Sequence, residues 1–206
     1  MEQEVKRFEL WIFLTLILGV ISVFSIISIV SASTANTTIN STLSSLISIA
    51  STGTVTLNVL PSGSGSQTIG SDTVTVNTNN STGYTLSIAS SSGSNSLISG
   101  ANSIPASSGT QASPVVQAAN TWGYCVSGVG GFGATCPSVG VSNQAISGTN
   151  KFAGMPATGS PNTIATTATT AVNATTTVWY AVAANTSQAG STTPYTGTIT
   201  YTATAN

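Results

Sequence analysis

The sequence closes with Tyr195-Thr-Gly-Thr-Ile-Thr-Tyr-Thr-Ala-Thr-Ala-Asn206, the stretch with the clearest pattern in the chain. From Tyr195 to Ala203 every second residue is apolar or small, and threonine fills each position between them. Alternation with a period of two is typical of a β-strand that has one face against a core and the other in water. The stretch therefore predicts a half-buried closing strand.

Shorter alternating runs recur upstream of this strand. Residues 54–59, 73–76, 84–88 and 178–182 each alternate apolar and polar residues, and a short strand is expected near 96–98. The loop 79–83 between the second and third runs predicts a hairpin. Only 42–50 offers a short helix. The prediction is a mainly β fold: an antiparallel two-sheet, Ig-like sandwich over 54–206, preceded by one N-terminal hydrophobic helix.

The N-terminus carries the hydrophobic segment. Residues 10–30 are uncharged and, as a helix, would extend about 31 Å, enough to cross a bilayer core. Lys6 and Arg7 precede the run and small residues follow it. This order predicts a signal peptide or a single membrane anchor over 1–32, with pilin-type processing as a weaker alternative. In each case the remainder is expected to be extracellular or at the cell surface, secreted or held by this helix.

Charge is almost absent from the rest of the chain. After Glu9 only Asp72 and Lys151 are charged, and the chain has no histidine. We interpret both as solvated loop charges. General acid–base catalysis and metal binding need titratable or ligating side chains, so the sequence argues against an enzyme and predicts neither a metal nor a cofactor. Nucleic-acid binding is excluded because it depends on Lys and Arg contacts to phosphate.

The two cysteines enclose ten residues. In an exported chain, Cys125 and Cys136 are expected to form a disulfide. Between them, Gly128, Gly130 and Gly133 match a dinucleotide-binding spacing, but the motif requires a strand before it, a helix after it and a later acidic residue. We interpret the stretch as a glycine-rich surface loop with Phe132 as its one large side chain.

Three segments together carry a family resemblance: 74–86, 120–124 and 195–206. Their order resembles a group of exported Ser/Thr-rich β-sandwich surface proteins of reduced-genome, candidate-phylum bacteria. The resemblance implies export and a sandwich fold. It implies no catalytic activity, because the shared motifs are a turn, core aromatics and a closing strand.

These patterns favour a non-enzymatic cell-surface structural protein: a fibre, pilus or coat subunit, or an anchored adhesin domain. Residues 33–53 are expected to be a linker, the domain's own first strand, or a strand donated to a neighbouring copy in a homo-polymer. The candidate assembly residues are Ile39, Leu43, Leu46, Ile47 and Ile49.

The alternative is a surface module that binds carbohydrate or another ligand, such as a surface glycan, through exposed aromatic rings. The candidate stacking residues are Trp122, Tyr124, Phe132 and Trp179, although core packing is the usual role of such side chains. Asn-x-Ser/Thr sequons also mark possible glycosylation sites at Asn36, Asn40, Asn79, Asn80, Asn173 and Asn185.

Overall fold

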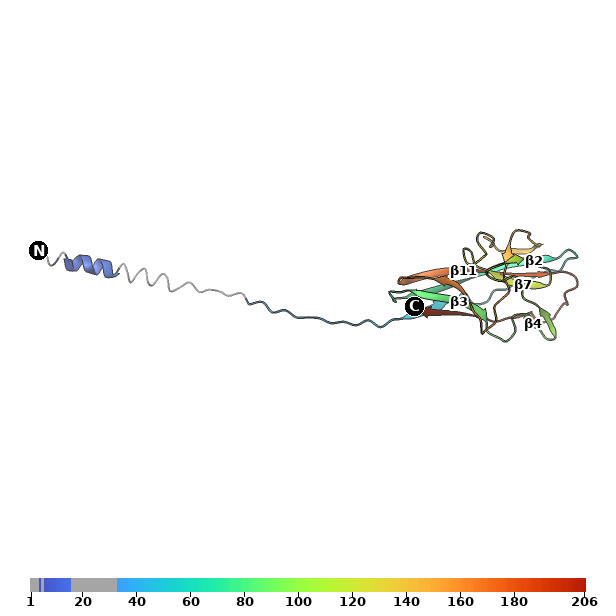
Figure 1. The fold of residues 1–206 in the computed structure, drawn as a ribbon, viewed down its shortest axis with the longest axis horizontal. Coiled ribbons are helices and arrows are strands. Elements are labelled where there is room, and N and C mark those ends of the chain that lie inside the picture. The colour runs from blue at the N-terminus through green and yellow to red at the C-terminus, as the bar shows by residue number, and fades with distance from the viewer. Residues whose placement is uncertain (1–3, 5, 16–32) are drawn as a thin grey trace. The chain divides into compact units, whose positions relative to one another are not determined.

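The computed structural model describes residue 4, residues 6–15 and residues 33–206. The chain divides into two compact units, Met1–Leu43 and Ser44–Asn206, and the predicted sandwich lies inside the second (Figure 1). Residues 6–15 are helical. Within the described ranges no helix has the length and apolar character needed to span a bilayer. Most of the predicted hydrophobic segment, residues 16–30, lies outside the described residues.

The second unit is built from β-strands, and every pairing between them is antiparallel. The larger sheet has the order β1-β2-β11-β7, with β8 also on β2, and a second sheet has the order β10-β3-β12. Two small sheets pair β4 with β5 and β6 with β9. The strands are β1 (Ile47–Ala50), β2 (Ser66–Thr78), β3 (Tyr84–Ser90), β4 (Leu97–Ser99), β5 (Asn102–Ile104), β6 (Val115–Val116), β7 (Thr121–Cys125), β8 (Val141–Ala145), β9 (Lys151–Phe152), β10 (Asn162–Thr166), β11 (Ala171–Ala184) and β12 (Ile199–Ala205).

The core lies between the two larger sheets. Val74 and Val76 of β2 and Leu86 and Ile88 of β3 are all fully buried and belong to one hydrophobic cluster. Such inward positions alternate with exposed or half-buried ones, as expected for sheets that each have one face on a core. The mainly β, antiparallel sandwich is thus confirmed, and the Ig-like connectivity stays a prediction.

The clearest alternations were located correctly. The closing strand is β12, in which Thr200, Thr202 and Thr204 are exposed and the residues between them half-buried. The run at 178–182 lies within the longer strand β11, and the run near 96–98 becomes β4. Periodicity was informative here because each strand has one wet face.

The predicted hairpin is wrong. Strands β2 and β3 are consecutive but do not pair: β2 pairs with β1, β8 and β11, whereas β3 pairs with β10 and β12. The loop 79–83 instead carries the chain from one sheet to the other. Asn80 holds this turn, since its carbonyl accepts the Gly83 amide and its side-chain amide donates to the Gly83 carbonyl.

Two other expectations are also wrong. Residues 54–59 form no strand, although Val55, Leu57 and Val59 are half-buried and alternate with exposed neighbours. The short helix expected at 42–50 is instead strand β1, which pairs with the end of β2. At 47–50 the pairing with β2, and not the local sequence, determines the conformation, whereas 54–59 alternates without a neighbouring backbone in ladder register.

The predicted disulfide is present, between Cys125 at the end of β7 and Cys136, with Cα atoms 5.6 Å apart. The loop that it closes is not a plain surface loop, because Phe132 is fully buried and makes an edge contact with Tyr124 at a centroid distance of 5.6 Å. The loop is therefore attached to the core by the Phe132 ring in its middle and by the disulfide at its two ends.

Reduction of this disulfide should cost about 3 kcal/mol of unfolding free energy, because the open loop gives the unfolded chain more conformational freedom. Urea unfolding with and without a thiol reductant would measure the loss. A double variant, Cys125→Ala with Cys136→Ala, serves as the control and should not respond to the reductant. Equal stability of the reduced and oxidised wild-type protein would contradict this account.

Candidate functional site

The four aromatic side chains proposed for ligand stacking are packed into the protein. Trp122 is 4% exposed and Tyr124 and Phe132 are not exposed at all. Trp179 is half-buried and packs against the same core. The indole N–H of Trp122 donates to the Asn95 carbonyl, which satisfies its only polar atom. These rings form no exposed row on which a ligand could stack. The expected stacking role is therefore wrong, and the four side chains pack in or against the core.

The sequons fall into two groups. Asn79 and Asn80 donate hydrogen bonds from their side-chain nitrogens, and Asn185 accepts one at its side-chain oxygen. Asn36, Asn40 and Asn173 are exposed. Since a glycan is attached to the side-chain nitrogen, attachment at Asn79 or Asn80 would disturb the bonds that this nitrogen donates, whereas the bond at Asn185 Oδ1 would not be replaced.

The most unusual arrangement involves residues 44–60, which we call the clasp segment. At its start Asn79 acts as an additional peptide group: its side-chain oxygen accepts the Leu46 amide at 2.7 Å, and its side-chain nitrogen donates to the Ser44 carbonyl at 2.9 Å. The Thr78 hydroxyl donates to the Leu46 carbonyl at 2.8 Å. Strand β1 then continues along β2 with Ile47 opposite Thr78.

Asp72 holds the middle of the clasp segment. Its carboxylate accepts the Thr52 amide at 2.9 Å and also accepts the Thr52 hydroxyl. Asp72 is only 3% exposed and lies within β2, so its interpretation as a solvated loop charge is wrong. It shares the inward face of β2 with Val74 and Val76, and a buried carboxylate requires such donors. Lys151, in contrast, is exposed at the start of β9.

The last part of the clasp segment covers the inner face of β2 at Gly70. A Cβ atom at Gly70 would lie 2.9 Å from Leu57 Cδ2 and 3.3 Å from Val55 Cγ1, so the absence of a side chain there makes room for these two. The Thr68 hydroxyl donates to the Asn58 carbonyl at 2.7 Å, and Asn143 Oδ1 accepts the Leu60 amide at 2.5 Å. Outside β1, which pairs with the backbone of β2, the backbone groups of residues 44–60 are thus bonded mainly by side chains of the body.

The expected assembly residues divide between two environments. Ile39, Leu43 and Leu46 are 88%, 83% and 70% exposed. Ile47 and Ile49 lie in β1, which is paired with the chain's own β2. The residues that bind the segment were missed because they are polar. A signal was available for Asp72, since it stands in phase with Val74 and Val76 in the sequence.

Two tyrosine hydroxyls lie next to the clasp, between the sheets. Tyr180 of β11 and Tyr201 of β12 are hydrogen-bonded through their hydroxyl oxygens at 2.6 Å. Burial is the main cause that raises the pKa of each, and the nearby Asp72 charge adds to it. Both hydroxyls are therefore protonated at neutral pH, and a protonated Tyr201 can donate to the Asp72 carboxylate.

The comparisons with known proteins add no assignment: no family model, curated protein or solved structure matches this chain. The resemblance to exported surface proteins of candidate-phylum bacteria therefore stays a prediction.

Replacement of Thr52 by Val should weaken the clasp, because the buried Asp72 carboxylate loses one of its donors. A hydrogen bond to a charged group contributes roughly 1.5–3 kcal/mol, and the exposure of Thr52 places the expected loss near the lower end. Urea unfolding would give the change in stability, and limited proteolysis would show faster cleavage within residues 44–60. Thr54→Val, at an exposed threonine two positions further on, is the matched control; equal behaviour of the two variants would contradict the role of Asp72.

Stability should fall above about pH 10 because buried tyrosines resist ionisation. Burial raises the pKa of Tyr124 from 10.0 to about 12 and raises that of Tyr84. Between these values the unfolded chain releases the proton and the folded protein keeps it, so each pH unit costs about 1.4 kcal/mol for Tyr124. The contribution of Tyr124 to the free energy of unfolding is fully present below pH 10 and is lost as the pH rises through about 12. Urea titrations at several alkaline pH values would measure the slope, which Tyr124→Phe should reduce; an unchanged slope in this variant would contradict the assignment.

Proposed function

We propose that this protein is a non-enzymatic structural subunit of a cell-surface assembly, such as a fibre, pilus or coat, and that the clasp segment joins neighbouring copies. The copy that supplies residues 44–60 and the copy that binds them would be identical chains. Exchange of an identical element is a low-cost route to assembly, because each contact within one chain is reproduced between two.

The observation that carries the proposal is the way in which the clasp segment is bound. Its backbone is held by side chains of Asp72, Thr78 and Asn79, and its apolar side chains rest over Gly70. This is how a groove holds an extended peptide: hydrogen bonds to the main chain give affinity, and alternate side chains enter the core. The segment also forms only four residues of regular strand, so few ladder bonds must break before it can leave.

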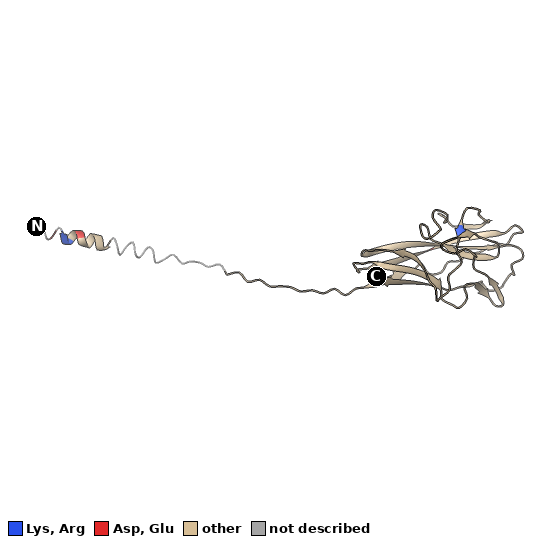
Figure 2. Ribbon diagram, viewed as in Figure 1, with Lys and Arg blue, Asp and Glu red and all other residues tan. Residues whose placement is uncertain are grey.

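The uncharged surface supports assembly as well. Asp72 and Lys151 are the only charged side chains between Ser44 and Asn206, and the folded unit is tan, the colour of residues that are neither basic nor acidic, almost throughout in Figure 2. Charged side chains on exposed edges normally prevent strands of different molecules from pairing. A surface with a net charge near zero also favours association. Export, with the N-terminal segment as signal or anchor, would concentrate the protein at one surface.

The test compares assembly of the full chain with that of a groove-blocked variant. Gly70→Val places a branched side chain where Leu57 and Val55 lie, so it should expel the clasp segment from its own groove and from a neighbour's. Negative-stain electron microscopy and analytical ultracentrifugation of the wild-type chain should then show ordered polymers that Gly70→Val abolishes.

Gly63→Val is the matched control, because a Cβ at Gly63 meets no atom within 4 Å. It should assemble as the wild type does. A wild-type chain that stays monomeric at high concentration would refute the proposal, and an anchored adhesin domain would then be the leading function. Polymers that persist in Gly70→Val would show that assembly uses another surface.

A further inference from the structure

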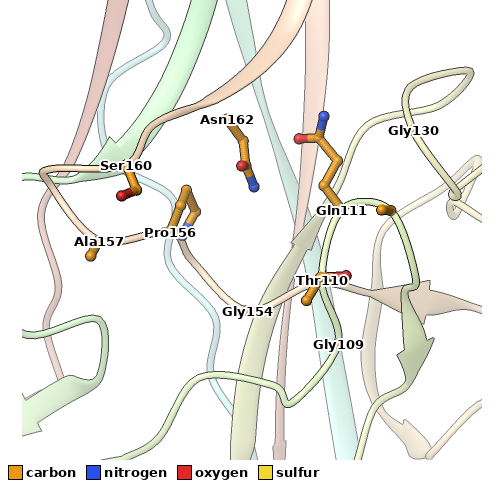
Figure 3. A pocket seen from close by; sticks show the side chains of 10 residues that line it. Gly109, Thr110, Gln111, Gly130, Gly154, Pro156, Ala157, Ser160 and Asn162 are labelled. Carbon is orange, nitrogen blue, oxygen red and sulfur yellow. The ribbon is translucent and has the colours of Figure 1, made fainter.

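A pocket of about 480 Å³ lies on the folded unit, and none of the four aromatic residues singled out in the sequence lines it (Figure 3). Its walls come from three stretches of chain: 109–112, Gly130 of the disulfide loop, and 154–162. Figure 3 shows the side chain of Asn162 directed toward the space between these walls. No lining residue is charged.

A chain of hydrogen bonds, which we call the relay, fixes the orientation of the Gln111 and Asn162 side-chain amides at the pocket. Gln111 Nε2 donates to the Thr163 carbonyl at 2.8 Å, and a carbonyl can only accept, so Gln111 Oε1 must be the atom that faces Tyr124. The Tyr124 hydroxyl donates to this oxygen at 2.9 Å. With its proton so placed, the hydroxyl can only accept from Asn162 Nδ2, at 2.8 Å.

The consequence is a side-chain amide of known orientation. Asn162 Nδ2 uses one of its two N–H groups on Tyr124, which leaves the second N–H as a donor and Oδ1 as an acceptor. The Tyr124 hydroxyl keeps its proton at neutral pH, and burial, which raises its pKa to about 12, extends this into the alkaline range. Asn162 therefore offers one fixed donor beside one fixed acceptor in an uncharged pocket.

The opposite wall is also held before any ligand binds. The Gly131 amide donates to the Gln111 carbonyl at 2.8 Å, so the disulfide loop supports this residue from behind. Thr110 and Ser113 exchange two backbone hydrogen bonds of 3.1 Å, which close the wall into a tight turn. Because these residues are already held in place, the protein loses little conformational entropy when a ligand binds.

The chemistry of this pocket selects its ligand. A donor beside an acceptor pairs with two adjacent hydroxyl groups, each of which can both donate and accept. The uncharged lining offers no counter-charge to an ion, and the volume lies within the usual range of 300–1,000 Å³ for small-ligand sites. We propose that this pocket binds a neutral saccharide, with the side-chain amide of Asn162 bonded to two neighbouring sugar hydroxyls. The site shares no residue with the clasp, so it goes beyond the assembly proposed above.

The experiment follows the Asn162 side-chain amide by ¹H–¹⁵N NMR. The full chain is prepared in a detergent that carries no sugar, and it is titrated with methyl glycosides of glucose, galactose and mannose and with N-acetylglucosamine up to hundreds of millimolar. At least one of these should shift the Asn162 resonances saturably. Asn162→Asp, which removes both N–H donors and the side-chain signal itself, is followed through the backbone amide of Gly130 in the pocket wall, and it should weaken the Kd at least about tenfold, or 1.4 kcal/mol.

Two tryptophan variants separate binding at this pocket from a general effect on the fold. Ser160→Trp fills the pocket from its exposed rim without removing any bond of the relay, and it should abolish the shifts. Ser138→Trp, at an exposed serine that does not line the pocket, should leave the Kd unchanged. The proposal is overturned if no sugar shifts Asn162, or if the shifts persist in Ser160→Trp. Because Ser160 lies outside the clasp, neither result alters the assembly measurement.

Discussion

The antiparallel pairing of β2 with β11 is the constraint on which the rest of the folded unit depends. It runs from Ser66 opposite Ala184 to Thr78 opposite Ala171, and its only irregularity lies at the far end, between Ala171 and Ala174. Because the register is unbroken between Ser66 and Val76, the face of every β2 residue in that stretch is fixed. Gly70 and Asp72 must then lie on the inward face of β2 with Val74. The clasp segment binds to this face because its contacts are with these two residues.

The same pairing explains which parts of the fold could be predicted from sequence. Alternation reveals which residues share a face, so the closing strand and the run at 178–182 were located correctly. It does not reveal which strand lies alongside, so it predicts a hairpin of β2 and β3 although these strands belong to different sheets. The prediction for Asp72 is wrong for a related reason: its charge favours a solvated loop, whereas its phase with Val74 places it on the inward face of β2.

The two sites were harder to predict because they join residues that are distant in sequence. The clasp brings Thr52 to Asp72 and Leu60 to Asn143. In the pocket, the relay links Gln111, Tyr124 and Asn162. Side chains such as Asn and Gln carry no periodic signal, so no local pattern indicated either arrangement. The sequence singles out the ring of Tyr124 as a candidate for ligand stacking. In the structure it is the hydroxyl group that positions other residues, through its hydrogen bonds to Gln111 and Asn162.

In this protein, side-chain amides make the polar contacts between distant segments that ion pairs make in other proteins. The chemical stability of these amides therefore determines how long the fold stays intact. Asn80 shows the consequence most clearly, since its Nδ2 donates to the Thr82 hydroxyl and to the carbonyls of Gly83 and Asn206. Hydrolysis of that amide would leave a carboxylate, which has no proton to donate at neutral pH, facing three oxygen atoms. Spontaneous deamidation, visible as a new acidic species on isoelectric focusing, would therefore loosen the turn between the two sheets. In a cell-surface assembly such as the one proposed above, the chemical lifetime of a few amides would then limit how long each copy stays folded.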